Sequence, residues 1–217
     1  MQILKITLLS AVVLFSATTQ AQFMGETSKQ IFKVPGLDDS LAKHKTVAIL
    51  PFKATIGYKR LPKKYDAAAN AEEEKKMGVI MQQGMYTYLL RKDGKYTVSF
   101  QDVERTNILL KQAGVYDKLD EMLPDSLARI LKVDAVIRCS YAYEKTGSEA
   151  GAIVTSVLIG GAGKTGSGSL TMQINNASEG VLLWRFYKEM NETFTSNGNA
   201  VMERMMRKVS RNFPYEK

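Results

Sequence analysis

The feature that most constrains this fold is a short apolar run at residues 46–52, which closes at Pro51 and Phe52. A short and continuously apolar run of this kind is typical of a strand buried on both faces of a sheet. Residues 71–91 then repeat apolar side chains at spacings of three and four, which predicts one face of an amphipathic helix. Asn70 and Glu73 resemble a capping box at the start of this helix. The two patterns together predict an α/β layer.

The next elements continue this alternation. The sequence predicts a strand at residues 96–100, a helix from Asp102 to near Gly114, a short helix beginning at Pro124, and a strand at residues 135–143. The order β-α-β-α-α-β favours parallel pairing of the strands.

The second half of the chain changes character. It has an apolar run at 152–159, a glycine-rich loop at 160–168, a strand and its hairpin partner at 169–174 and 181–187, and a closing helix at 200–211. We therefore expect an α/β fold with a mixed sheet of about five to six strands and helices packed on it. Residues 46–213 form a single domain in this interpretation, after a linker-like segment at 22–45.

The amino terminus has the pattern of a secretory signal. Lys5 precedes an apolar run at residues 6–15, and small residues lead to a cleavage position near Ala21, so residues 1–21 are expected to be removed. The run is shorter than the ~20 residues that a spanning helix needs. An uncleaved anchor stays open as the alternative. No cysteine follows the run, so we expect a periplasmic protein that is not lipidated.

The chain has one histidine and one cysteine, and this limits its chemistry. A disulfide, a Cys/His zinc cluster and a Cys-His charge relay all need more of these residues. His44 lies among lysines and is predicted to be solvated, whereas Cys139 lies in an apolar stretch and is predicted to be a packed thiol. We expect no catalytic residue, no metal ligand and no cofactor, although a hydrolase that uses paired carboxylates stays open.

Residues 161–165 invite comparison with a phosphate-binding loop. Such a loop needs a glycine where this chain has Leu158, and it should open a helix where this chain predicts a strand. We therefore predict a hairpin loop without nucleotide. Residues 151–161 are predicted to form a sheet strand, and a strand that enters the outer membrane stays open as the alternative.

One basic stretch follows the first strand and has no acid before Asp66. Its candidate partner-binding residues are Lys59, Arg60, Lys63 and Lys64. In a chain with a formal net charge of +8, this stretch could hold an anionic membrane surface or an acidic protein, and a solvated loop is the plain alternative. Arg204, Lys208 and Arg211 share one face of the last helix, where they offset the helix dipole. The chain has no recognised motif for nucleic acid.

Three segments together resemble a known group of bacterial envelope proteins. They are residues 47–52 (VAILPF), 131–137 (LKVDAVI) and 178–184 (SEGVLLW). The group includes the curli-secretion lipoprotein CsgG, the TolB amino-terminal domain and LpoB-type activator lipoproteins. The resemblance implies a periplasmic α/β sandwich that binds envelope partners and catalyses no reaction. This chain departs from the group because it lacks the lipidated cysteine.

These observations predict an exported, non-enzymatic protein that binds or assembles other proteins of the cell envelope. An oligomeric outer-membrane secretion component of the CsgG type is the alternative within the binding proteins. An envelope hydrolase with paired carboxylates is the alternative among enzymes. Homo-oligomerisation is open in each case.

Overall fold

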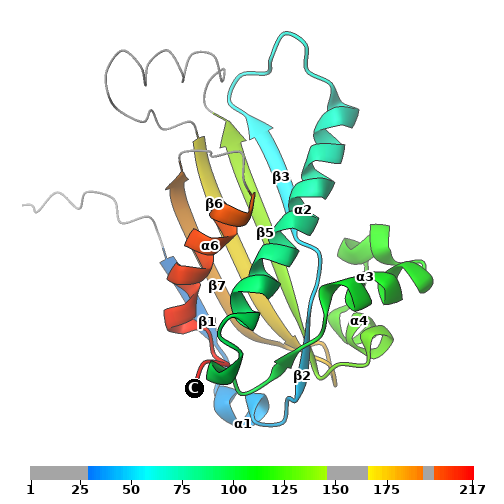
Figure 1. Ribbon diagram of the computed structural model, residues 1–217, viewed down its shortest axis with the longest axis vertical. Helices are drawn as coiled ribbons and strands as arrows, with labels where there is room; N and C mark the ends of the chain where they lie inside the picture. The colour runs from blue at the N-terminus through cyan, green and yellow to red at the C-terminus, as the bar shows by residue number, and fades with distance from the viewer. Residues whose placement is uncertain (1–28, 146–165, 193–197) are drawn as a thin grey trace, which may run out of the picture.

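A computed structural model describes residues 29–145, 166–192 and 198–217 of the chain (Figure 1). These residues form one sheet of seven strands in the order β1-β7-β6-β5-β2-β4, with β3 also paired to β5. The strands are β1 (Lys29–Lys33), β2 (Thr46–Ile49), β3 (Lys53–Tyr58), β4 (Ser99–Phe100), β5 (Ala135–Lys145), β6 (Gly166–Asn176) and β7 (Leu182–Glu192). The helices are α1 (Leu37–Leu41), α2 (Ala67–Leu90), α3 (Val103–Gln112), α4 (Pro124–Leu131) and α6 (Gly198–Val209), with 3₁₀ turns η1 (Asp93–Lys95), η2 (Tyr116–Glu121) and η3 (Ser210–Asn212).

The strand pairing confirms the predicted mixed α/β sheet. β2 pairs in parallel with both β4 and β5, and β3 continues along β5 in parallel after the chain passes Pro51. The long strands β5, β6 and β7 form an antiparallel meander, of which β6 and β7 are the predicted hairpin. The sheet is therefore parallel at one edge and antiparallel at the other.

The helices cover the two faces of the sheet unequally. α2 and α6 lie across one face and enclose the larger core, which contains Met81, Met85, Trp184 and Met205 among many others (Figure 1). α3 and α4 pack against the opposite face, in a smaller core that includes Ala48, Leu50 and Val136. Helix α4 has its apolar residues on one side, so Leu127 and Leu131 are buried there.

Two segments that the sequence predicts to be irregular have regular structure instead. The predicted linker contains a strand and a helix, and the basic stretch begins with a strand. In the described part of the predicted linker, β1 pairs antiparallel with β7 and α1 buries Leu37 and Leu41. The start of the basic stretch forms β3, in which Ala54 and Ile56 face the core. Both strands are short edge strands with lysines and other polar residues, so they lack the continuous apolar run used to predict strands.

The predicted capping box at Asn70 is wrong. α2 begins earlier, and the Asp66 side chain accepts hydrogen bonds from the backbone N–H groups of Ala68 and Ala69. Asn70 is buried within the helix instead, where its side-chain amide donates to the backbone carbonyl of Ile56 at 3.2 Å. This contact fixes the start of α2 against β3.

Some predictions concern residues outside the described ranges. They are the signal at 1–21, the apolar strand at 152–159 and the loop at 161–165. In the ranges that are described, none of the helices combines the length and apolar character that crossing a membrane requires.

Candidate functional site

Among the described residues, no helix covers the second half of the sheet face that lies opposite α2 and α6, here called the uncovered half. Val136 of β5 lies under α3 and α4, but further along the strand the side chains on the same face become half-buried and then exposed. Arg138 and Ser140 are half-buried, whereas Ala142 and Glu144 are exposed. A sheet face without a helix over it presents polar side chains to solvent, as this alternation does.

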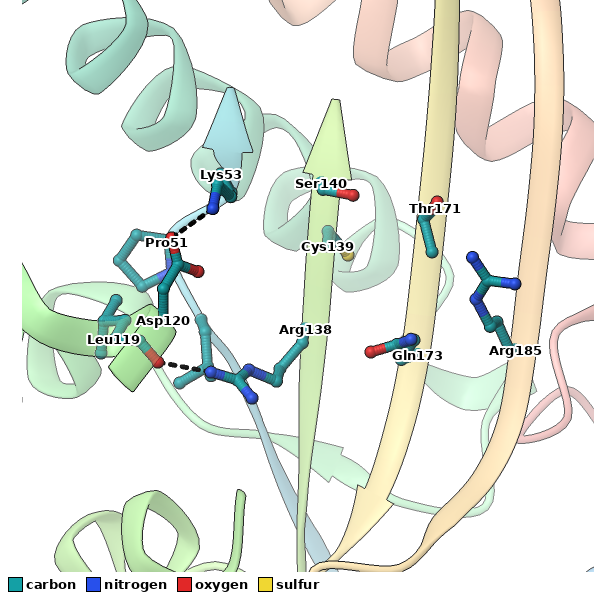
Figure 2. A pocket seen from close by; sticks show the side chains of 11 residues that line it. Pro51, Lys53, Leu119, Asp120, Arg138, Cys139, Ser140, Thr171, Gln173 and Arg185 are labelled. Carbon is teal, nitrogen blue, oxygen red and sulfur yellow. Dashed lines mark hydrogen bonds and ion pairs between the residues drawn. The ribbon is translucent and has the colours of Figure 1, made fainter. Parts of the chain in front are cut away.

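A polar pocket of about 310 Å³ lies on this uncovered face. Its floor is formed by β5, β6 and β7, and one wall is the 3₁₀ turn η2 (Figure 2). The strand register places Arg138 opposite Gln173 and Gln173 opposite Arg185, so these three side chains form a row across the sheet. Ser140, Thr171 and Lys53 form a second row beside it. The pocket therefore combines basic, hydroxyl and amide groups.

Two of the basic residues are held by the turn η2. Arg138 donates from Nη2 to the backbone carbonyl of Leu119, and also to that of Met122 at 3.2 Å. Lys53 Nζ lies 2.7 Å from Asp120 Oδ2 (Figure 2). Both side chains of that ion pair are more than half exposed, so the pair contributes little to stability. It does show that a carboxylate can lie against this face.

Arg185 is the third basic residue of the pocket. Within the described parts of the chain it makes no hydrogen bond or ion pair, and no dashed line reaches it in Figure 2. It is half-buried on β7 beside Gln173. A guanidinium presents its N–H donors in a planar fork that matches a carboxylate or a phosphate. Arg185 is therefore the residue of this pocket that can offer N–H donors to an anion.

Cys139 borders the pocket but is not reactive. The prediction of a packed thiol is confirmed, since the side chain is 6% exposed and faces the larger core. Burial raises the pKa of the Cys139 thiol well above its usual value. Nucleophilic chemistry needs the thiolate, so this residue serves packing.

The predicted binding residues Lys59, Arg60, Lys63 and Lys64 lie elsewhere. All four are exposed in the loop between β3 and α2, and none of them lines the pocket. The rings of Tyr58 and Tyr65 meet edge to face at this loop, with centroids 5.6 Å apart. The loop therefore groups the four cations as expected, and their binding role stays a prediction.

Sequence reasoning missed the pocket residues. Arg138 stands in the middle of the otherwise apolar run at 135–143, and that interruption was the available signal. Arg185 and Gln173 gave no such signal, because each simply alternates with apolar residues in a hairpin strand. The described residues contain no cluster of three or more His, Cys, Asp and Glu side chains arranged to hold a metal ion.

The prediction that His44 is solvated is wrong. Its side chain is only 6% exposed, because the carboxyl-terminal segment packs over it. His44 Nδ1 and the Tyr215 hydroxyl are 2.7 Å apart. Burial lowers the pKa of His44, although Asp134 and the Asn176 side chain act in the opposite direction. Burial also raises the pKa of Tyr215, so a neutral imidazole and a protonated phenol share this hydrogen bond.

We expect the stability of the protein to fall as pH decreases from about 7 to about 5. The lowered pKa of His44 means that the unfolded chain binds a proton more readily than the folded chain, so protonation favours unfolding. Urea denaturation at several pH values measures this dependence. The variant His44→Gln cannot titrate, and its stability should be flat over the same window.

A second group titrates in a separate, more acidic window. Burial acts to raise the pKa of Asp134, but hydrogen bonds from the backbone N–H groups of Thr46 and Lys45, together with the charge interactions with His44 and Lys45, lower the pKa overall. The stability from Asp134 is lost only below about pH 4. A slope above pH 5 that persisted in His44→Gln would contradict the role assigned to the imidazole.

Comparison with known proteins gives fold neighbours only. No family model matches the chain, and no curated protein matches it. Solved structures with a similar fold include the lipoprotein GNA1162 from Neisseria meningitidis, at 14% identity and a TM-score of 0.43, covering 77% of this chain and 94% of that one. They also include the PelC dodecamer from Paraburkholderia phytofirmans, at 14% identity and a TM-score of 0.40, covering 87% of this chain and 96% of that one.

The C-terminal domain of LpoB from Escherichia coli is a further neighbour. It is 13% identical, with a TM-score of 0.34 over 73% of this chain and 94% of that one. LpoB-type proteins are the part of the predicted resemblance that the solved structures include, and its CsgG and TolB parts stay predictions. At these identities and scores, the likenesses identify no ligand or partner for this chain.

Proposed function

We propose that this protein is a non-enzymatic binding protein of the bacterial cell envelope, which holds an acidic segment of another envelope protein on the uncovered half of its sheet. The observation that carries the proposal is the placement of Arg185. Its guanidinium stands in an open polar pocket and makes no hydrogen bond or ion pair within the described part of the chain. The signal-like pattern at residues 1–21 supports export to the envelope.

Charge supports an acidic partner. The pocket contains Lys53, Arg138 and Arg185 but only one acid, Asp120. Asp120 already lies against Lys53, so a carboxylate has a demonstrated position on this surface. A carboxylate from a partner could contact Arg185 with two parallel hydrogen bonds, which are among the stronger polar contacts in proteins.

The shape of the surface supports a protein rather than a small molecule. A site for a small molecule is usually concave, mostly apolar, and between about 300 and 1,000 Å³ in volume. This pocket is at the lower limit and is lined by polar groups such as Gln173 and Thr171. It continues onto the exposed side chains of Ala142 and Glu144, so a flat partner surface or an extended segment fits it better.

The test is photo-crosslinking in living cells from a probe at Thr171, which lines the pocket. The probe should give an adduct with one envelope protein, and mass spectrometry should map it to an acid-rich segment. The variant Arg185→Glu should weaken this adduct at least about tenfold, since hydrogen bonds to charged groups contribute ~1.5–3 kcal/mol and reversal adds repulsion.

Lys76→Glu is the matched control for this experiment. It changes the charge by the same amount at an exposed position of α2, on the other face of the sheet. The yield of crosslinked adduct from this variant should equal the yield from the unchanged protein. An adduct that survives Arg185→Glu, or one that maps to a segment without acids, would overturn the proposal.

A further inference from the structure

A second charged surface lies on the opposite face of the sheet, at the edge formed by β1, β7 and α6 (Figure 1). It is an open groove of about 500 Å³, here called the cationic groove. Six of its seven lining residues are basic: Lys29, Lys188, Arg204, Arg207, Lys208 and Arg211, with Asn212 beside them. No acidic side chain of the described residues lines it.

Helix α6 with the turn η3 after it, and the paired strands β1 and β7, build this groove. On α6 and the turn after it, residues 204, 207, 208 and 211 are spaced by three and four, so they share one face of the helix. On the sheet, Lys29 of β1 is directly opposite Lys188 of β7. The neighbouring pair in this register, Ile31 and Phe186, belongs to the core under the helices, so the two lysines emerge on the same face as α6.

This arrangement concentrates like charge. Like charges opposite each other on paired strands are destabilising, and so are like charges four residues apart on a helix. The acid on α6, Glu203, forms an ion pair with Arg91 of α2 instead of entering the groove. The helix dipole favours cations such as Arg207 and Lys208 in the last turn, but it gives no reason for lysines on the strands.

The position of Lys29, shortly after the signal-like segment at residues 1–21, favours a membrane as the ligand of the groove. Lys29 is the first described residue, and seven residues separate it from the predicted end of the signal-like segment at about Ala21. Seven residues span at most about 25 Å when extended. A signal segment held in the membrane during export would therefore keep Lys29, and the groove that it lines, near the lipid headgroups.

We infer that the cationic groove is a docking surface for an anionic membrane, where it binds the phosphate groups of lipid headgroups. The groove is on the face of the sheet that carries α6, whereas the pocket at Arg185 is on the other face. The protein can therefore contact a membrane and a protein partner at the same time. The inference does not depend on the function proposed above.

The expected effect follows from the number of charges. Each Lys or Arg near an anionic membrane strengthens binding by roughly fivefold. The triple variant Arg207→Gln/Lys208→Gln/Arg211→Gln should therefore bind phosphatidylglycerol vesicles roughly 100-fold more weakly. Binding of the unchanged protein should also decline as salt rises above about 0.1 M, where the screening length is ~10 Å.

The experiment is vesicle co-sedimentation with the purified protein. Phosphatidylglycerol vesicles should bind it, and phosphatidylcholine vesicles should not. The comparison variant is Lys76→Gln/Arg105→Gln/Lys118→Gln, which removes the same number of charges from exposed positions on α2, α3 and η2, outside the groove. It should retain binding within about threefold, since none of its three residues lines the groove.

A second variant, on the strands, tests whether a loss of binding in the helix variant is due to the lost charges or to misfolding. Lys29→Gln/Lys188→Gln changes the groove from the sheet side and should weaken binding roughly 25-fold. Circular dichroism should give both groove variants the spectrum of the unchanged protein. Equal binding to phosphatidylcholine, no binding to either vesicle, or loss of binding in the comparison variant but not in folded groove variants would each overturn the inference.

Discussion

Trp184→Ala is expected to lower the free energy of unfolding by about 3–5 kcal/mol, the usual range for removing a large aromatic side chain from a core. Trp184 is completely buried on β7. Its ring stacks on Phe186 with centroids 6.0 Å apart and meets Phe213 edge to face at 6.1 Å. The loss combines the transfer of apolar area with the cavity that remains between the sheet and α6.

Trp184→Phe is the matched variant for this prediction. It retains an aromatic ring between Phe186 and Phe213, and it removes an indole N–H that has no hydrogen-bond partner among the described residues. Its cost should stay below about 1.5 kcal/mol. Urea denaturation followed by circular dichroism measures both variants. If the alanine and phenylalanine variants were equally stable, the packing assigned to this core would be incorrect.

The second large effect is expected at Gly78→Ala, with a loss of about 2–3 kcal/mol. Gly78 lies in α2 where the helix crosses the connection between β2 and β3. A Cβ atom added there would lie 2.2 Å from the backbone carbonyl oxygen of Phe52, and backbone cannot rotate away as a side chain can. Relieving the clash requires α2 to move from the sheet.

Movement of α2 would break specific contacts. The N–H of Phe52 donates to the carbonyl of Gly78 at 3.3 Å, and Gln82 Nε2 donates to the carbonyl of Ile49 at 2.7 Å. Alanine is the better helix former by about 1 kcal/mol, so the clash must exceed that gain for the variant to be less stable. With a backbone atom this close, we expect the clash to dominate.

Gly94→Ala is the control for the glycine prediction. No atom lies within 4 Å of a Cβ added at Gly94, so this variant should be within about 0.5 kcal/mol of the unchanged protein. The same denaturation experiment compares the two. A Gly78→Ala variant as stable as Gly94→Ala would show that α2 does not approach the chain at Phe52 so closely.

Sequence alone could predict the elements whose periodicity comes from burial. β2 is a continuous apolar run because it is covered on both faces, and α2 repeats its buried methionines Met77, Met81 and Met85 at a spacing of four. The hairpin of β6 and β7 alternates apolar and polar residues because no described helix covers one of its faces. In each case the pattern of apolar residues in the local sequence follows from which faces of the element are buried.

The edges of the sheet and the site could not be predicted in the same way. β1 has one core-facing residue, Ile31, between lysines and other exposed side chains, so its sequence resembles a linker. The pocket depends on strand register, which places Arg138 and Arg185 in one row although they are far apart in sequence. The burial of His44 depends on Tyr215 at the other end of the chain.

The central claim is that the uncovered half of the sheet is occupied by a partner in the cell. Thiol labelling tests it directly, because the natural Cys139 is buried and its raised pKa keeps it unreactive. A cysteine at Thr171→Cys lies in the pocket, and one at Ser178→Cys is exposed on the turn between β6 and β7. A small maleimide is applied to intact cells and to purified protein.

We predict that Thr171→Cys reacts readily in the purified protein and is protected in intact cells, whereas Ser178→Cys reacts equally in both. Labelling of Thr171→Cys in intact cells at the rate seen in the purified protein would contradict the claim.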